Sequence, residues 1–340
     1  MGKRQVCPRS PPNSPSASDH TKFSRLVQDF FDEMWAELRF SAVWPSLEGF
    51  GPRIAGPSKI PIITVTGSKN GPSRNDVMPD YIEVCEKAVR GAGALLLDRI
   101  GRVKVYEKGP ADLVTEADLA AQQFVRKVVL EAFPDHLVLG EEDQAPVETR
   151  RATGCPRWIV DPLDGTTNYV HQVPFFAVSL ALEQEGDLLV GAVYHPSADE
   201  YFLALPGQGA YRNGVRIHTS NVISLGSALV SVGFPSAVTA DCPDLRLFNE
   251  AVLLSQSIRR TGSVALNLAY VAAGHFDVAW SYCAKVWDVA AGKLLIREAG
   301  GVATSFAGED LPLEHGPALA AANRPLHGEM MALIRRLGLR

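Results

Sequence analysis

The chain has 340 residues, of which 46% are hydrophobic and 21% are charged, so disorder throughout is excluded. Its apolar runs, such as residues 175–182, are far shorter than the roughly 18 residues that a membrane span requires. Residues 1–77 hold 10 Lys and Arg against 7 Asp and Glu, which leaves 33 − 10 = 23 against 38 − 7 = 31 for the rest of the chain. Because the apolar runs are too short to span a membrane, we expect no membrane association. Because a region this acidic is repelled by a nucleic acid backbone, we expect no nucleic acid partner.

The five cysteines are odd in number, widely scattered and never arranged as C-x-x-C. This pattern argues against a disulfide framework and against a zinc knuckle, and it fits a reducing compartment. The sequence shows no apolar segment typical of a secretion signal. We therefore predict a cytoplasmic protein.

The first 77 residues differ in composition from the rest. Residues 1–20 and 51–76 are rich in Pro, Ser, Gly and Asn and lack the apolar content that offsets the entropy of ordering. Between them, residues 23–40 carry apolar side chains at near-helical spacing. We predict a disordered or poorly ordered extension over residues 1–77 and hypothesise that Met78 is the true start of the protein.

Two helices are predicted at the beginning of the remaining chain. A helix is expected over residues 80–100 with Asp80 as its cap, and residues 102–107 alternate as a strand. Thr115 and Asp118 resemble a capping box that opens a second helix, which ends near residue 133. Two antiparallel helices follow from this pattern.

Strand patterns come next, and the pair Asn213-Gly214 marks a two-residue hairpin. The strands are expected at residues 137–140, 158–160, 176–183, 188–195 and 201–204. We therefore predict that residues 78–222 form a helix pair packed on a mostly antiparallel sheet.

After about residue 222, strands and helices alternate, which predicts a layered α/β half over residues 223–340. Strands are expected at residues 229–233, 258–260, 277–280, 301–304 and 319–321, and helices at residues 244–256, 264–273, 289–299 and 326–337. The predicted fold class is α/β (α+β), with layers in the order α-β-α-β-α.

Carboxylates at the ends of predicted elements are the candidates for chemistry. The sequence contains no motif of a nucleotide-binding loop, a nucleophile elbow or a zinc protease. An apolar strand at residues 158–160 delivers Asp161 at its end, and the proline that follows stiffens a turn that brings Asp164 back. Because Mg²⁺ prefers oxygen ligands, this turn offers it two carboxylates and the Leu163 carbonyl together.

The same segments also have simpler explanations when each is taken alone. A D-x-x-D-G sequence is common in turns, residues 141–143 resemble a solvated acidic loop, and Asp288 heads a helix pattern as an N-cap. Gly165 and Thr166, however, follow the aspartates directly and present N–H groups for a phosphate oxygen. The combination of the three acidic segments predicts a metal and anion site.

Five blocks of sequence carry a resemblance to a known family. The blocks are D-L-V-T-E-A-D at residues 112–118, G-E-E at 140–142, W-I-V-D-P-L-D-G-T-T-N-Y-V-H at 158–171, R-T-G-S-V-A-L at 260–266 and W-D-V-A-A-G at 287–292. In this order they resemble the inositol monophosphatase family of lithium-sensitive, Mg²⁺-dependent phosphatases. The resemblance runs from about Asp80 to the C-terminus, and it implies a sandwich fold of the sugar-phosphatase type and a homodimer.

The resemblance also implies roles for individual residues. The expected ligands of two or three Mg²⁺ ions are Glu141, Asp161, the Leu163 carbonyl, Asp164 and Asp288, with Asp161 bridging two ions. Thr166 and Glu141 are expected to orient and deprotonate the attacking water, while Asp118 polarises the Thr166 hydroxyl, a role compatible with its place in a capping box. Substrate contacts are expected from Leu163, Asp164, Gly165, Thr166, Gly262, Ser263, Ser281 and Asp288.

One position departs from the family pattern. Ser281 stands where animal inositol monophosphatases carry a glutamate that binds inositol hydroxyls. The function expected first is hydrolysis of inositol monophosphate or a similar small polyol or sugar monophosphate. Fructose bisphosphate, 3′-phosphoadenosine 5′-phosphate and histidinol phosphate are alternative substrates, and a regulatory binding protein on the same fold is the alternative of another class.

His171, His195 and Lys108 are not assigned to the site, since none of them stands at a metal-ligand spacing or at the family's own position.

Overall fold

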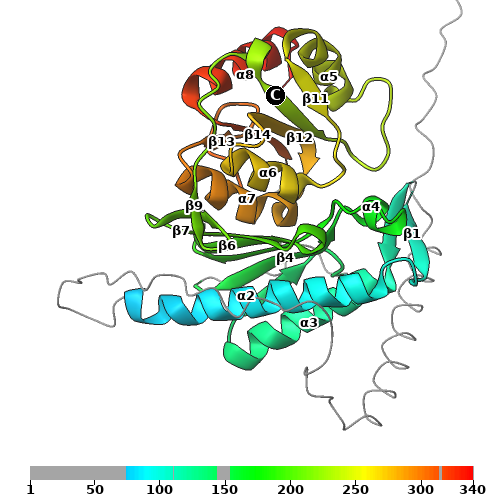
Figure 1. The fold of residues 1–340 in the computed structure, drawn as a ribbon, viewed down its shortest axis with the longest axis vertical. Helices are drawn as coiled ribbons and strands as arrows, with labels where there is room; N and C mark the ends of the chain where they lie inside the picture. The colour runs from blue at the N-terminus through cyan, green and yellow to red at the C-terminus, as the bar shows by residue number, and fades with distance from the viewer. Residues whose placement is uncertain (1–73, 110, 144–153, 314–315, 340) are drawn as a thin grey trace, which may run out of the picture. The chain divides into compact units, whose positions relative to one another are not determined.

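Figure 1 shows two large β-sheets and three layers of helices in this computed structural model, which describes residues 74–109, 111–143, 154–313 and 316–339. For residues 74–80 only the backbone is described. The predicted extension over residues 1–77 therefore lies outside the described residues, except for residues 74–77, which begin the first helix. In the part that is described, no helix combines the length and apolar content that crossing a bilayer requires.

Helix α2 (Arg74–Arg99) packs on one face of the first sheet. It buries Cys85, Val89 and Leu96, which recur at the helical spacing that the sequence predicted. The helix begins at Arg74 and not at Asp80, so Asp80 lies inside the helix and does not cap it.

Helix α3 (Glu116–Ala132) packs beside α2 and follows a small hairpin of β1 (Val105–Gly109) and β2 (Asp112–Thr115). The predicted capping box is present, since the Thr115 side chain accepts a backbone N–H of the first turn and Asp118 accepts from Thr115 N. Strand β2 was not predicted, although its D-L-V-T sequence leads directly into the cap.

The first sheet has seven strands in the order β3-β4-β5-β6-β7-β8-β9, and within it only β3 and β4 run parallel. All of β4 is buried because helices cover both faces, so that Trp158 and Val160 face α2 and α3 while Ile159 faces the next helix layer. The predicted Asn213-Gly214 turn joins β8 and β9 with positive φ at both residues. The strands are β3 (Leu137–Gly140), β4 (Arg157–Asp164), β5 (Ala177–Gln184), β6 (Asp187–His195), β7 (Glu200–Leu205), β8 (Gly209–Arg212) and β9 (Val215–Ile217).

Strand β4 does not end before Asp161, as the sequence predicted, but continues through a bulge to Asp164. Asp161 pairs with Ser179 and Asp164 pairs with Ala177, so three steps along β4 match two steps along β5. Residues three apart on a regular strand point to opposite faces of the sheet. The extra residue of the bulge reverses that alternation once, and the two aspartates therefore share a face.

Helices α6 (Val264–Ala272) and α7 (Val286–Glu298) lie between the two sheets, and α5 (Pro243–Leu254) and α8 (Arg324–Arg336) cover the outer face of the second sheet (Figure 1). The second sheet has the order β11-β10-β12-β14-β13. Its strands are β10 (Leu229–Gly233), β11 (Ser257–Arg259), β12 (Val278–Ala284), β13 (Val302–Thr304) and β14 (Gly316–Ala321). The predicted α-β-α-β-α order of layers is confirmed.

Gly292 lets α6 and α7 pack closely, because a Cβ at this position would lie 2.5 Å from the Leu268 Cβ. We expect Gly292→Ala to lower the free energy of unfolding by about 1–3 kcal/mol, the usual cost of overpacking a filled core. Gly328→Ala is the matched control, since Gly328 lies in α8 with nothing within 4 Å of its Cβ position. The control should raise the free energy of unfolding by up to about 1 kcal/mol through helix propensity. Urea denaturation measures both changes, and equal effects of the two variants would contradict the close approach of α6 and α7.

Candidate active site

One pocket of about 660 Å³ collects most of the residues that the sequence singled out. It lies beyond the carboxyl ends of two sets of parallel strands, β3 with β4 and β10 with β11 and β12. This is the usual position of ligands in sheets that contain parallel strands. The predicted residues on its wall are Glu141, Asp161, Leu163, Asp164, Gly165, Thr166, Gly262 and Asp288.

Asp161 and Asp288 are brought to the same pocket across strand β5. Asp161 pairs with Ser179 of β5, and the Ser179 hydroxyl donates to the Trp287 carbonyl at 3.1 Å. This bond fixes the beginning of α7, in which Asp288 is the third residue and not the N-cap weighed from the sequence. The Asp288 carboxylate accepts from Lys285 N at 2.8 Å, so the first turn of the helix also holds the side chain.

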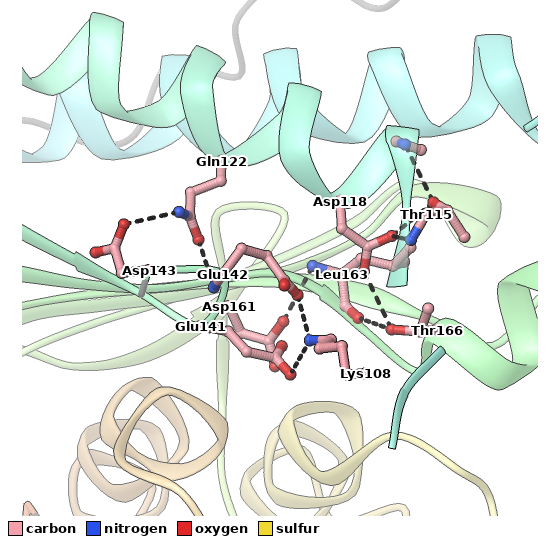
Figure 2. Close-up of polar contacts among 11 residues, drawn as sticks. Lys108, Thr115, Asp118, Gln122, Glu141, Glu142, Asp143, Asp161, Leu163 and Thr166 are labelled. Carbon is pink, nitrogen blue, oxygen red and sulfur yellow. Dashed lines mark hydrogen bonds and ion pairs between the residues drawn. The ribbon is translucent and has the colours of Figure 1, made fainter. Parts of the chain in front are cut away.

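Glu141 follows β3 in a loop that α3 holds in place (Figure 2). Gln122 accepts a backbone N–H from this loop at 3.0 Å, and Gln122 and Arg126 donate to Asp143 Oδ1 at 3.1 Å and 2.7 Å. Gly140 is required for this contact, because a Cβ there would lie 2.1 Å from Gln122 Oε1. The acidic loop is therefore clamped to the helix layer and is not the solvated loop considered as its simpler explanation.

Asp164 connects the first sheet to helix α6. Its carboxylate accepts from the Ser263 hydroxyl, from Val264 N at 3.2 Å and from Ala265 N at 2.7 Å. The first N–H groups of a helix lack partners within the helix, and the helix dipole favours an anion beside them. The Ser263 hydroxyl also accepts from Leu266 N, and Ser263 is 1% exposed. Ser263 therefore holds Asp164 in place through its buried hydroxyl. It does not line the pocket, although a substrate contact was expected from it.

Ser281 is also absent from the pocket wall, although a substrate contact was predicted for it. Strand β12 continues to Ala284 and does not end at residue 280 as predicted, so Ser281 pairs with Gly233 inside the sheet. Its side chain is buried there. The structure does not support a direct contact between Ser281 and a ligand in this pocket.

Thr166 begins the short helix α4 (Thr166–Val170), directly after Gly165 with a φ of 101°. Its hydroxyl lies 3.2 Å from Asp118 Oδ1 and 3.1 Å from the Leu163 carbonyl oxygen (Figure 2). The other oxygen of Asp118 accepts from the backbone N and the hydroxyl of Thr115. One carboxylate therefore caps α3 and contacts Thr166, so the two roles considered for Asp118 are compatible.

Burial dominates the electrostatics of the acidic side chains. Desolvation is the main cause that raises the pKa values of Asp161, Asp164 and Asp288, and repulsion from Glu141 raises all three further. The pKa of Asp164 rises only to about 6, because the hydrogen bonds from α6 stabilise its charged form. Asp161 accepts one backbone hydrogen bond, from Leu163 N at 3.0 Å. Its charge is therefore the least compensated of the four among the residues that the structure describes.

Lys108 pairs with the acidic loop, although it was not assigned to the site from the sequence. Its Nζ lies 3.2 Å from Glu141 Oε1 and 2.6 Å from Glu142 Oε1 (Figure 2). Burial works to lower the pKa of Lys108, but the two glutamates outweigh it and raise that pKa above its usual value. Across the described ranges, no three His, Cys, Asp or Glu side chains are arranged as ligands of one ion. Glu141 pairs with Lys108 instead, and Asp161 and Asp288 accept nearby backbone N–H groups.

Asn168 is a site residue that was not predicted, although it stands in the D-G-T-T-N string. Its Nδ2 donates to the Phe175 carbonyl at 2.7 Å and to the Thr261 carbonyl at 2.8 Å, which ties α4 to the loop before α6. Gly262, with a φ of 90°, permits this approach, since a Cβ there would lie 2.8 Å from Asn168 Nδ2. The asparagine therefore joins the two sides of the pocket.

The pocket wall also includes residues outside the predicted set, among them His171, Phe234 and Arg260. His171 and Arg260 stand in two of the family-like blocks but were not assigned a role, whereas Phe234 reaches the wall only because β10 ends there. His195 lies away from the pocket, buried and bonded through Nε2 to the Pro174 carbonyl at 3.0 Å.

Known proteins resemble the chain along most of its length. A model of the inositol monophosphatase family matches residues 78–339. Inositol-1-monophosphatase of Rhizobium meliloti (strain 1021) is 39% identical over 259 residues, which cover 75% of this chain and 96% of that protein. Nus factor SuhB of Pseudomonas aeruginosa is 40% identical over 249 residues, which cover 72% of this chain and 92% of that protein.

The solved structures give the same result. Extragenic suppressor protein suhB from Bartonella henselae matches with a TM-score of 0.70 and 35% identity, over 76% of this chain and 99% of that one. The matched region begins where the sequence resemblance begins, and it contains every acidic residue of the pocket. The chain therefore belongs to the inositol monophosphatase family of phosphatases.

Proposed function

We propose that the chain is a Mg²⁺-dependent phosphatase that hydrolyses inositol monophosphate or a similar small polyol or sugar monophosphate. The observation that carries this proposal is the meeting of Glu141, Asp161, Asp164 and Asp288 in one pocket beside the Thr166 hydroxyl. The relative from Rhizobium meliloti is named an inositol-1-monophosphatase, which supports inositol monophosphate as the first substrate to test.

The donor set fits a hard divalent cation. Mg²⁺ prefers carboxylate and carbonyl oxygens, and buried carboxylates without basic partners need a compensating positive charge. We assign Glu141, Asp161, the Leu163 carbonyl, Asp164 and Asp288 as the groups that hold two or three ions. Asp161 is the expected shared ligand, because repulsion from each of the other three carboxylates raises its pKa. Bound Mg²⁺ lowers the pKa of a coordinated water and offsets the charge that develops on a phosphoryl group.

Thr166 and Glu141 position the attacking water in this proposal. The Thr166 hydroxyl donates to Asp118, so its oxygen is left to accept a hydrogen from a water in the pocket. Glu141 then takes a proton from that water, after its pairing with Lys108 has loosened. The backbone groups expected to contact the phosphate or the alcohol belong to Gly165, Thr166 and Gly262, all on the pocket wall.

The burial of Ser281 bears on the choice of substrate. No carboxylate is available at this position to bind inositol hydroxyls, so fructose bisphosphate, 3′-phosphoadenosine 5′-phosphate and histidinol phosphate stay as alternatives. Inhibition by Li⁺, a homodimer and a cytoplasmic location complete the proposal, since each is typical of the family.

A second candidate function is regulatory binding on the same fold. The name Nus factor SuhB, carried by the relative from Pseudomonas aeruginosa, favours this candidate. A binding scaffold has no need of four carboxylates in one pocket, however, and their presence favours turnover of a small phosphomonoester over binding of a nucleic acid.

A phosphate-release screen over small phosphomonoesters, with and without Mg²⁺, tests the two candidates against each other. We expect release to require Mg²⁺ and Asp161→Asn to lower kcat/KM by at least about 100-fold, because one shared negative charge is lost. Asp187→Asn, an exposed position at the start of β6, is the matched control and should retain the wild-type rate. Near-normal activity of Asp161→Asn would refute the metal assignment, and no Mg²⁺-dependent release from any substrate would favour regulatory binding.

The raised pKa values predict a pH-dependent effect of Mg²⁺ on stability. Burial raises the pKa values of Asp118 and Asp164 to about 6, whereas an aspartate in the unfolded chain titrates near 4. The folded state therefore binds more protons than the unfolded state between those values. The resulting stabilisation is complete below about pH 4 and is lost as the pH rises through about 6. Asp161 and Asp288, whose pKa values are raised well above the usual value, extend this loss to higher pH.

Bound Mg²⁺ replaces the lost protons, so the increase in Tm on adding Mg²⁺ should be several degrees larger at about pH 8 than at about pH 5.5. Calorimetry in EDTA and in Mg²⁺ at both pH values measures this difference. The two samples of each comparison have the same pH, so ionisable groups that do not bind the metal cancel. An increase in Tm that is equal at the two pH values, or larger at the lower one, would contradict the assignment of these carboxylates.

A further inference from the structure

The pocket has a second wall that the proposed chemistry does not use. Strands β10 and β11 run parallel, so their carboxyl ends reach the same edge of the second sheet. Phe234 directly follows β10 and Arg260 directly follows β11, and both line the pocket. The Arg260 guanidinium carbon lies 5.1 Å from the centroid of the Phe234 ring.

Arg260 carries an uncompensated charge at this edge. Within the residues that the structure describes, it makes no hydrogen bond and no ion pair, and it is the only Lys or Arg on the pocket wall. Its side chain is exposed, so it is not a buried structural cation. A guanidinium that stacks on an aromatic face still presents its N–H groups at the edge of its plane, where they can bind an oxyanion in a bidentate manner.

The backbone on both sides of this pair is held in place. The Thr261 carbonyl accepts from Asn168 at 2.8 Å, and the Thr261 hydroxyl donates to Asn267 at 2.6 Å. Phe234 packs against Phe248 of α5 with ring centroids 6.0 Å apart. Arg260 therefore extends into the pocket from a fixed base, and only its own side-chain rotations need to be ordered when it binds a ligand.

The position of Arg260 separates it from the carboxylates. Strand β10 lies between β11 and β12, so the ends of β11 and β12 are about 9–10 Å apart, two strand spacings. Arg260 directly follows β11, whereas Asp288 lies in the first turn of α7, after β12. The pocket volume of about 660 Å³ is that of a site for a whole small molecule and far exceeds one phosphate. When a phosphoryl group reacts at the carboxylates, Arg260 is therefore still available to bind another part of the same substrate.

We propose that the pocket selects phosphomonoesters that carry a second anionic group, a phosphate or a carboxylate, and that Arg260, stacked on Phe234, binds this second group. The proposal rests on the proposed function, since it assigns the reacting phosphoryl group to the carboxylate wall. It also accounts for the buried Ser281, because selection by the charge of a distal anion does not require a side chain that binds polyol hydroxyls.

The test compares two substrates that differ by one phosphate, fructose 1-phosphate and fructose 1,6-bisphosphate. We expect the wild-type protein to have the higher kcat/KM for the bisphosphate. Arg260→Gln should lower the ratio of the two kcat/KM values by about tenfold or more, because a charge-assisted bidentate contact is lost. Arg260→Lys should give a ratio between those of the wild-type protein and Arg260→Gln, since lysine keeps the positive charge but not the planar pair of N–H donors.

Arg259→Gln is the matched control. Arg259 is the adjacent exposed arginine, it does not line the pocket, and it donates to the Ser257 hydroxyl and the Ile258 carbonyl. This variant should keep the wild-type ratio. An unchanged ratio in Arg260→Gln overturns the proposal, whether both rates fall together, as they would if Arg260 held the reacting phosphate, or neither rate changes.

A binding measurement separates failure of this inference from failure of the proposed function. If neither sugar phosphate releases phosphate with Mg²⁺, the proposed hydrolysis of such substrates fails. Calorimetric titration of both sugar phosphates, with Ca²⁺ in place of Mg²⁺, then still tests Arg260. Tighter binding of the bisphosphate that is lost in Arg260→Gln supports the second anion site, and equal binding of the two sugar phosphates by the wild-type protein overturns it.

Discussion

Repulsion among four clustered carboxylates, of which Asp161 and Asp164 are buried, is the constraint on which the rest of this structure depends. Two like charges about 5 Å apart, at an effective dielectric constant of about 20, repel by about 3 kcal/mol. A fold that gathers such groups has to hold each of them by contacts that do not relax away from the others. Three features of the chain do so: the bulge in β4, the side-chain hydrogen bonds from α3 to the acidic loop, and the bond from Ser179 to the start of α7.

The four carboxylates are not equivalent, and the difference explains where a cation is needed most. Asp164 lies on the N-terminus of α6 and accepts three hydrogen bonds there, so the protein itself compensates much of its charge. Glu141 has Lys108 beside it. Asp161 accepts a single backbone N–H, and the other three carboxylates all repel its charge. Asp161 is therefore the residue that most needs bound cations. The contacts of Asp164 also join the first sheet to α6, so the integrity of the pocket and the packing of α6 depend on the same side chain.

The sequence predicted those features that depend on neighbours a few residues apart. The Thr115–Asp118 capping box is such a feature, and so are the buried face of α2 and the Asn213-Gly214 turn. The layer order was predicted as well, because it follows from the alternation of helix and strand patterns. The carboxylates themselves were found through their position at the ends of elements and through the family resemblance.

Features that depend on distant partners could not be read from the sequence. Asp164 bonds the start of α6 about a hundred residues later, and Lys108 meets Glu141 only through the fold. Ser281 was expected to contact the substrate because the resemblance places it where the family carries a glutamate, whereas pairing with β10 and β14 extends β12 past it and buries its side chain. Arg260 and Phe234 meet because two strand ends coincide at one edge of a sheet, which no local pattern encodes.

The most direct test of the central claim is a crystal structure with Mn²⁺ in place of Mg²⁺, in which anomalous scattering locates the ions. The account predicts two or three anomalous peaks within ligand distance of Asp161, Asp164, Glu141 and Asp288, at least one of them shared through Asp161, with Glu141 released from Lys108. Peaks only at other surfaces, with Glu141 still paired to Lys108 and the aspartates free of metal, would contradict it.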